Sequence, residues 1–409
     1  MQTKAKNLIK ALLFTLGLCL IVMGLSRVFE RKTSAQMYDA FFDAKENFDV
    51  LFLGTSHTSN GVLPLQLWQE QGIGSYNMAG HGNQLATTYW VLVNALDYTD
   101  PSVVVLDLSY LSENQKTSLV SVNQTHVSLD AIPFSWNKIR MVNDLFDTTE
   151  EKAEFLADFI IYHDRWSELT AEDFHYQPLS YKGAAPGYSV AVPQATAKLD
   201  RSEVCDSDTV GVEYLRKILE LCKEKDIEVV LTYLPFPASE DKQREANLGY
   251  EIAENYEVPY LNFLDMDVVD YDTDCLDADS HLNLSGAVKV TRYLGEYLRA
   301  NYDLPDRRED EDYASWQQEA DTFSKTISGL LLIDQTSPLT SLMLLAEPDI
   351  HATLTVSTDQ SQWEDSRWIS MIQYASQFHT VLYADGEDFQ NFKIDVTDAD
   401  GNSYGTVCW

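Results

Sequence analysis

The sequence predicts an α/β fold in which helices cover both faces of a parallel sheet. Three observations support this fold class. Short apolar runs alternate with amphipathic stretches between residues 48 and 305. The run VVVL at 103–106 is continuously apolar and mostly β-branched, as in a strand that is buried on both faces. The stretch 211–226 has its apolar residues at helical spacing. This alternation is typical of strand–helix–strand units with parallel strands.

The elements follow one another in a regular order. Strands are expected at 48–54, 73–80, 101–111, 227–237 and 258–263. Helices are expected at 64–71, 85–98, 211–226, 238–256 and 285–302. The order predicts a three-layer, flavodoxin-like parallel sheet, in which ligands bind at the carboxyl ends of the strands.

Residues 112–205 interrupt the alternation after the third strand. This stretch is too long for an ordinary connection between neighbouring strands. Most of 144–169 has a helical pattern, and the tryptophans and apolar helix faces argue against a disordered loop. We therefore expect an inserted helical cap beside the site, within an α/β domain that spans residues 35–305.

The N-terminal residues differ in composition from the rest of the chain. The uncharged run 11–25 is preceded by lysines, of which Lys10 is the last, and is followed by Arg27. We expect residues 1–34 to form a cytoplasmic stub and an uncleaved transmembrane anchor, because lysines before a span favour the cytoplasm. The alternative is a signal peptide, but no small-x-small cleavage site follows the run. The domain at 35–409 is then extracytoplasmic.

The C-terminal quarter of the chain has a different pattern of charged and apolar residues. Residues 306–325 are strongly charged and predict a linker or helix. Residues 326–409 predict a small α+β domain, with helices at 339–347 and 365–376, a strand at 350–357 and two final strands. No chemistry is evident there, so a packing role is favoured over docking of a partner.

Composition limits the partners. Lysine and arginine number 29 against 64 acidic residues, which gives a net charge of −35. A surface of this sign repels phosphate backbones, so nucleic acid is not expected to bind. The five cysteines show no CxxC and no Cys/His zinc spacing, so neither a metal nor a cofactor is predicted. An extracytoplasmic location permits a disulfide, but the spacing selects no pair.

Three short stretches at the carboxyl ends of predicted strands carry side chains that suit acyl chemistry. Ser56 follows the first strand and precedes a helix N-terminus, where backbone amides can stabilise an oxyanion. His281 follows two acids, Asp277 and Asp279, either of which could bond its Nδ1. After the second strand, YNMAGHGNQ brings glycine amides and an asparagine amide to the same rim. Each stretch alone is a weak signal, since serine after a strand is usually a turn residue.

Together these stretches resemble the SGNH/GDSL hydrolase superfamily, with a serine after strand one, a glycine after strand two and Asp…His before the last helix. The resemblance covers about residues 36–305. The phrases DVLFLGTSH, SYNMAG, YLRKILELCKEK and DSHLNLSGA look most like its membrane-anchored bacterial branch. That branch includes proteins that help O-acetylate cell-surface glycans and the D-alanine transfer protein of Gram-positive walls.

The resemblance implies a role for each residue. Ser56 would be the nucleophile and His281 the base, while Gly80 and the Ser56 amide would bind the oxyanion. The family's acid position, three residues before the histidine, is Ala278 here, so Asp279 or Asp277 must substitute, with Asp279 slightly favoured. Asn83 would supply the amide that the family takes from a later block.

The resulting hypothesis is a serine esterase or O-acyltransferase that acts on a cell-surface polysaccharide. The resemblance also implies a membrane-bound O-acyltransferase as a partner that delivers the acyl donor. The alternative is a catalytically degenerate module of the same fold that binds glycan or scaffolds such a partner. Only the acidic surface suggests a third idea, a structural sheath protein.

Overall fold

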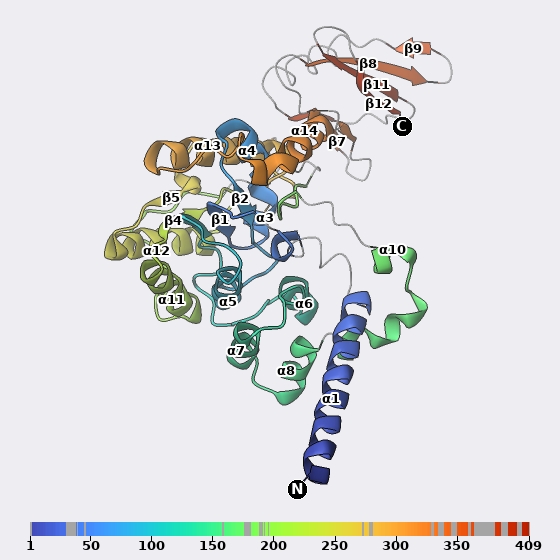
Figure 1. Cartoon of the computed structure of the whole chain (residues 1–409). Helices are drawn as coiled ribbons and strands as arrows, with labels where there is room; N and C mark the ends of the chain where they lie inside the picture. The colour runs from blue at the N-terminus through green and yellow to red at the C-terminus, as the bar shows by residue number, and fades with distance from the viewer. Residues whose placement is uncertain are drawn as a thin grey trace.

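The fold is described from a computed structural model of the whole chain (Figure 1). The description covers residues 2–29, 38, 40–44, 46–157, 159–175, 181–187, 191, 193–194, 196–271, 274–277 and 281–328, and the C-terminal strands 331–333, 339–344, 350–358, 361–363, 381–385, 392–398 and 403–408.

A five-stranded parallel sheet forms the centre of the molecule. The strands are β1 (Val50–Leu53), β2 (Ser75–Asn77), β3 (Val103–Asp107), β4 (Glu228–Tyr233) and β5 (Tyr260–Asn262). Their order across the sheet is β2-β1-β3-β4-β5, and every neighbouring pair is parallel. The predicted α/β class is therefore confirmed. In this strand order the crossover direction reverses between β1 and β3, which is where such sheets bind ligands.

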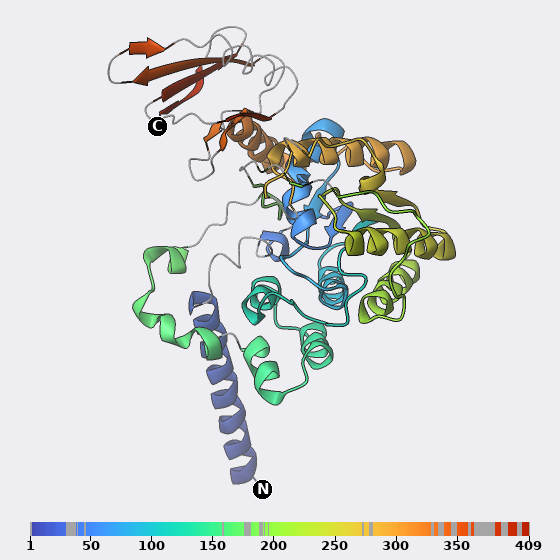
Figure 2. The ribbon, with the colours of Figure 1, turned by 180° about the vertical axis from the view of Figure 1, so that it is seen from behind.

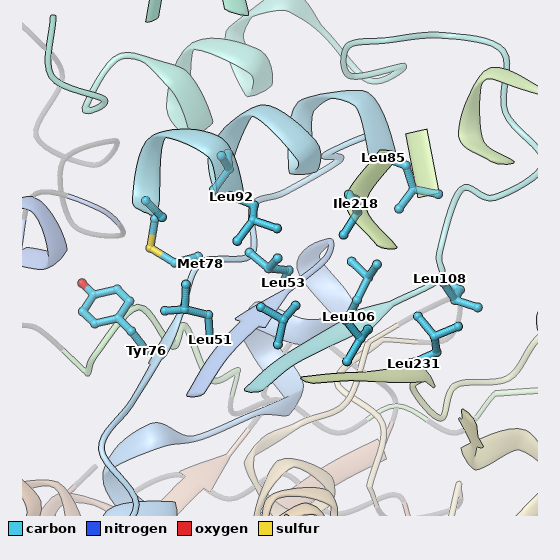
Figure 3. Packing of buried hydrophobic residues seen from close by; sticks show 14 of the residues in the cluster. Leu51, Leu53, Tyr76, Met78, Leu85, Leu92, Leu106, Leu108, Ile218 and Leu231 are labelled. Atoms are coloured by element: carbon cyan, nitrogen blue, oxygen red, sulfur yellow. The ribbon is translucent and has the colours of Figure 1, made fainter. Parts of the chain in front are cut away.

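Side chains that alternate along each strand build two separate cores. On one face Leu51, Leu53 and Leu106 pack in a cluster with helices α5 (Leu85–Ala95), α11 (Val210–Glu224) and α12 (Glu240–Tyr256), as Figure 3 shows in part. On the other face Val50, Phe52 and Val105 pack with helix α13 (Leu284–Asn301). The helices α3 (Ser56–Gly61) and α4 (Pro64–Gln71) contact α13 as well. Helices on both faces exclude water from the sheet, which explains the continuous apolar strands.

The insertion between β3 and α11 is helical over most of its described length. Its elements are α6 (Val122–Leu129), α7 (Trp136–Leu145), α8 (Thr149–Leu156), α9 (Phe159–Tyr162), the 3₁₀ helix η1 (His163–Ser167) and α10 (Ala171–His175). The first of these lie near α5, whereas α10 lies beside the N-terminal helix (Figures 1 and 2). The helical structure expected over 144–169 is present as the shorter pieces α8, α9 and η1.

The N-terminal helix α1 (Gln2–Phe29) projects from the sheet domain. Its segment Lys6–Ser26 has a mean hydropathy of 2.4 and is long and apolar enough to cross a membrane. Most of its described side chains are exposed to the surroundings, unlike those of a core helix.

The segment after α13 is part of the sheet domain. Helix α14 (Ala314–Ser328) packs on α4 and buries Trp316, Ala320 and Phe323 in the core. Of the two expectations for 306–325, a linker or a helix, the helix is present from Ala314 onward and is docked on the sheet domain, where Glu319 pairs with the buried Lys182 at 3.0 Å.

The described C-terminal residues form strands. They pair in a three-stranded sheet (β10-β7-β6) and a four-stranded sheet (β12-β11-β8-β9). The helix expected over 339–347 is wrong, because Leu339–Leu344 is strand β7 and pairs antiparallel with β10 (Val381–Asp385). Cross-strand pairing here outweighs the local helical preference of leucine and methionine. The helix expected over 365–376 lies outside the described residues.

Candidate active site

Ser56 is the first residue of α3, directly beyond the carboxyl end of β1. Thr55 caps the helix, and its Oγ1 accepts a hydrogen bond from the His57 amide at 3.2 Å. The chain leaves the strand through Gly54, whose φ of +150° is rarely adopted by other residues. A Cβ at Gly54 would lie 2.4 Å from Thr58 Oγ1 and 2.8 Å from Asp107 Cβ. A residue without a side chain is thus required for this tight exit.

His281 joins Ser56 from a loop that precedes α13. Its Nε2 lies 2.7 Å from Ser56 Oγ, and its Nδ1 lies 2.5 Å from Asp277 Oδ2. The loop is folded back on itself, since the Leu276 amide donates to the His281 carbonyl at 2.8 Å. Ser56, His281 and Asp277 thus form one hydrogen-bonded line, in which the serine is more than two hundred residues away in the chain from the His281–Asp277 pair.

The hydrogen bonds define the protonation of this line. A carboxylate can only accept, so Nδ1 carries the ring proton and Nε2 is left as the acceptor for the Ser56 hydroxyl. Asp277 also accepts a bond from the His281 amide at 3.3 Å, which holds the two residues in register. Asp279, the acid that the sequence slightly favoured, lies outside the described residues. Asp277 is the acid that the structure places on the imidazole.

A cavity of about 890 Å³ opens beside the serine. Its described lining is Ser56, His57, His81, Gly82, Ser109, Tyr110, Val120, Gln124, Gln194, Thr196, Phe236, Pro237, Ser239, Lys242 and His281. The lining combines hydroxyl and amide groups with two aromatic rings, and Val120 and Gln124 come from the insertion. The inserted region therefore contributes to the cavity wall, as a cap would.

Two further imidazoles, His57 and His81, face this cavity. The His57 ring lies 5.3 Å from the His281 ring and 4.4 Å from the Phe236 ring, measured between centroids. Burial, together with His281 and Lys242, lowers the pKa of His57 to about 3. Burial and His281 also lower the pKa of His81. Both rings are therefore neutral near pH 7 and can donate and accept hydrogen bonds without carrying charge.

The structure places the two predicted oxyanion residues behind the cavity wall. The Gly80 amide donates to the Gly54 carbonyl at 3.2 Å, because the β1–β2 hydrogen-bond ladder continues past the end of β2. The Asn83 side chain is 3% exposed, and its Nδ2 lies close to the Gly80 Cα and the Tyr38 hydroxyl. Neither residue belongs to the described cavity lining. The Gly80 amide is therefore already engaged by the Gly54 carbonyl, whereas the buried Asn83 Nδ2 has no acceptor among the described residues, and the donor role of both residues stays a prediction.

Two backbone amides beside the cavity could bind an oxyanion: that of Ser56, which the sequence predicted, and that of Gly82, which it did not. Ser56 and Gly82 both line the cavity, and Gly82 has a φ of +70°. Within the described part of the chain, no residue accepts a hydrogen bond from either amide.

Two buried carboxylates form hydrogen bonds with residues that line the cavity. Asp107 ends β3 and accepts hydrogen bonds from the Leu234 amide at 2.9 Å and from Ser109 Oγ at 2.5 Å. Burial raises the pKa of Asp107 to about 6. Glu245 on α12 is fully buried and accepts bonds from the Tyr110 amide at 2.9 Å and the Lys242 ammonium at 3.2 Å.

The contacts of Glu245 were not predictable from its position in the sequence. Its spacing to Lys242 is that of an ordinary exposed helix pair, and only the packing of α12 against the loop after β3 buries it. The contact of Asp107 with the Leu234 amide likewise depends on the chain after β4, which is more than a hundred residues away in the sequence.

Comparisons with known proteins add little to this geometry. In a search of solved structures, the chain is similar to a crystal structure from Bacteroides fragilis NCTC 9343, described as a "putative acylhydrolase". The identity is 12%, the match covers 65% of this chain and 94% of that chain, and the TM-score is 0.32. No protein-family model and no curated protein matches the chain.

Proposed function

We propose that this chain is an SGNH-type serine esterase or O-acyltransferase. The observation that supports this proposal best is the line from Ser56 Oγ through His281 to Asp277, with distances of 2.7 and 2.5 Å. A serine, a neutral imidazole and a carboxylate in this order are the elements of an activated nucleophile. The cavity beside the serine provides room for an acyl ester and an acceptor.

The proposed reaction is acyl transfer in two steps. In the first step Ser56 Oγ attacks the ester carbonyl while its proton passes to His281 Nε2. The tetrahedral oxyanion then collapses, the alcohol leaves with that proton, and an acyl-serine remains. In the second step His281 removes a proton from water or from a sugar hydroxyl, whose oxygen attacks the acyl carbon and releases Ser56. Asp277 stabilises the imidazolium that forms in each step.

The amides of Ser56 and Gly82 are the proposed oxyanion donors. The Ser56 amide is at the N-terminus of α3, where the helical backbone leaves amides without an intrahelical acceptor. Donors of this kind act only where charge develops in the transition state, so they lower the barrier without tightening substrate binding.

We further propose an extracytoplasmic location and a polysaccharide substrate. The apolar segment Lys6–Ser26 would anchor the chain with its N-terminus in the cytoplasm, because lysines precede the span. The hydroxyl and amide groups of the cavity suit a polyhydroxylated acceptor, and a membrane-bound O-acyltransferase would supply the acyl donor. A bacterial cell-surface glycan is the acceptor that the sequence resemblance implies.

A fluorophosphonate probe tests the proposal directly. The full chain in detergent should be labelled at Ser56, as mapped by mass spectrometry, and the Ser56→Ala variant should not be. Ser59→Ala is the matched control, because Ser59 is fully buried in the same helix and its hydroxyl donates to the Ser56 carbonyl at 3.2 Å. Equal labelling of the wild type and Ser59→Ala, with none in Ser56→Ala, supports an activated serine.

The choice of acid is tested with the same probe. Asp277→Asn should slow labelling about 10³-fold or more, because the amide no longer holds the reactive tautomer of the imidazole. Asp279→Asn should label at the wild-type rate. Slow labelling of Asp279→Asn alone would assign the acid to that residue. A folded wild-type chain that is not labelled at all would favour the non-catalytic, glycan-binding alternative.

A further inference from the structure

The insertion carries a cluster of exposed apolar side chains on α9, η1 and α10. Ile160 is 48% exposed, Trp166 72% and Phe174 59%. We call these three residues the α9–α10 patch. Large apolar side chains are seldom exposed together on a monomeric protein unless the surface has a partner.

The segment that carries the patch packs on the C-terminal end of α1. Phe159 of α9 packs edge-to-face on Phe29, with ring centroids 5.3 Å apart, and its amide donates to Ser26 Oγ at 3.1 Å. Arg165 of η1 donates to the Phe29 carbonyl. In both views α10 lies beside this end of α1 and away from the N-terminus (Figures 1 and 2). The apolar surface of α1 therefore continues onto the insertion.

Internal polar contacts hold the segment in this shape. Asp173 accepts hydrogen bonds from Arg165 at 3.1 Å and from the Thr170 amide at 2.8 Å. Asp173 is buried, and the Arg165 side chain is only 14% exposed. Arg165 and Asp173 thus face inward between η1 and α10, whereas Trp166 and Phe174 face outward. The acidic Asp164 and Glu168 face outward as well.

The negative charge of this segment argues against anionic lipid as its partner. Between residues 159 and 175 there are four acidic residues (Asp164, Glu168, Glu172 and Asp173) and one basic residue, Arg165. A segment of this composition gains nothing from the negative surface of anionic lipids, which attracts lysine and arginine. Tryptophan and phenylalanine, in contrast, partition into the interfacial layer of neutral bilayers.

We propose that the α9–α10 patch lies in the interfacial layer of the bilayer and forms a second membrane contact beside α1. The inference rests on the proposed membrane anchoring by α1. Lipid is favoured over a protein partner because the patch continues the surface of the only described helix that is long and apolar enough to cross a membrane. The contact would fix the orientation of the sheet domain relative to the membrane.

Quenching of tryptophan fluorescence by brominated lipid tests this contact. The full chain is placed in phosphatidylcholine nanodiscs, with or without brominated acyl chains, and the fluorescence lost per molecule is measured. Helix α1 contains no tryptophan, so the signal comes from the rest of the chain. Trp166→Phe keeps an apolar side chain but removes this reporter, so the lost fluorescence should fall. Trp136→Phe is the matched control, since Trp136 is 82% exposed and starts α7, which packs on α5 and α8.

The results distinguish failure of the patch contact from failure of membrane anchoring by α1. Lower quenching in Trp166→Phe, no change in Trp136→Phe and no increase with anionic lipid support the patch. Equal quenching of wild type and Trp166→Phe overturns it and leaves this surface to a protein partner. A chain that does not copurify with nanodiscs overturns the anchoring and the patch together. Fluorophosphonate labelling of both variants at the wild-type rate shows that they are folded and tests the site independently.

Discussion

Three histidines lie around one serine in this cavity, and their environments give them different tasks. His281 is held between Asp277 and Ser56, so both of its ring nitrogens are engaged. The His57 ring lies tilted by 56° against the Phe236 ring, and among the described residues none forms a hydrogen bond with its ring nitrogens. Because burial keeps His57 neutral, it can contact a substrate hydroxyl but does not compete for protons with the base.

His57 also makes the stability of the protein depend on pH. Its pKa is about 3 in the folded chain and about 6.5 when unfolded, so the unfolded state binds more protons between these values. Stability is therefore lost as pH falls below about 6.5. Between pH 7 and pH 5 the loss from this residue is about 1–2 kcal/mol.

Urea unfolding of wild type and His57→Phe at pH 7 and pH 5 measures this effect. The variant lacks the titrating group, so its loss of unfolding free energy over this range should be smaller by that amount. Other groups titrate in both proteins, so their contributions to the loss of unfolding free energy cancel in the comparison. The same loss in both proteins would mean that His57 is protonated in the folded chain.

At the scale of elements, the position of Ser56 depends on the junction of β1 and α3. Strand β1 is central in the sheet, α3 packs against α13, and only one glycine connects the strand to the Thr55 cap. The same α13 follows the loop that carries His281. The packing of α3 on α13 therefore fixes the positions of both Ser56 and His281.

Gly54→Ala should damage this junction. The new Cβ would overlap Thr58 Oγ1 and Asp107 Cβ, which should destabilise the fold by about 1–3 kcal/mol. Displacement of Ser56 should slow fluorophosphonate labelling about 10²-fold.

Gly61→Ala is the matched control within α3. Its Cβ would lie 3.6 Å from Leu234 and Leu282, which is ordinary contact, and its unfolding free energy should stay within about 1 kcal/mol of wild type. Thermal unfolding and labelling rates of the two variants make the comparison. If both behave alike, the exit from β1 is not strained as described.

At the scale of the whole molecule, the sheet domain ends at α14. Trp316 is fully buried, lies 6.2 Å from Trp68 between ring centroids, and donates to Glu46 at 2.9 Å. Arg307 joins the same region by an ion pair with Asp49 at 2.7 Å. The described C-terminal strands pair with one another and not with the central sheet.

Two truncations should therefore behave differently. A chain that ends at residue 328 should fold and be labelled at Ser56. A chain that ends at residue 305 loses Trp316, whose removal alone costs about 3–5 kcal/mol, a large part of the net stability of a domain. It should lose its cooperative thermal transition by circular dichroism, together with labelling. Equal labelling of both chains would show that α14 is dispensable.

Much of the molecule was predictable because local patterns specify it. Apolar runs located all five strands of the sheet, and helical spacing located the helices between them. This alternation indicated parallel strands, whose carboxyl ends bring Ser56 and His281 to one edge. The apolar run 11–25 predicted an N-terminal apolar helix, and in the structure the segment Lys6–Ser26 is long and apolar enough to cross a membrane. Strand β7 was missed because leucine and methionine suit either element until a partner strand is known.

The sequence by itself determined the layered fold and the serine and histidine at one edge of its sheet, since both follow from periodicity and from the order of elements. Only the tertiary structure decided which groups hold these residues. Asp277 reaches His281 because the loop from 274 to 283 folds back on itself. The Gly80 amide donates to the Gly54 carbonyl because their strands are neighbours in the sheet, and α14 docks on the sheet domain because Trp316 is buried there. Contacts of this kind join residues far apart in the chain, so no local pattern specifies them.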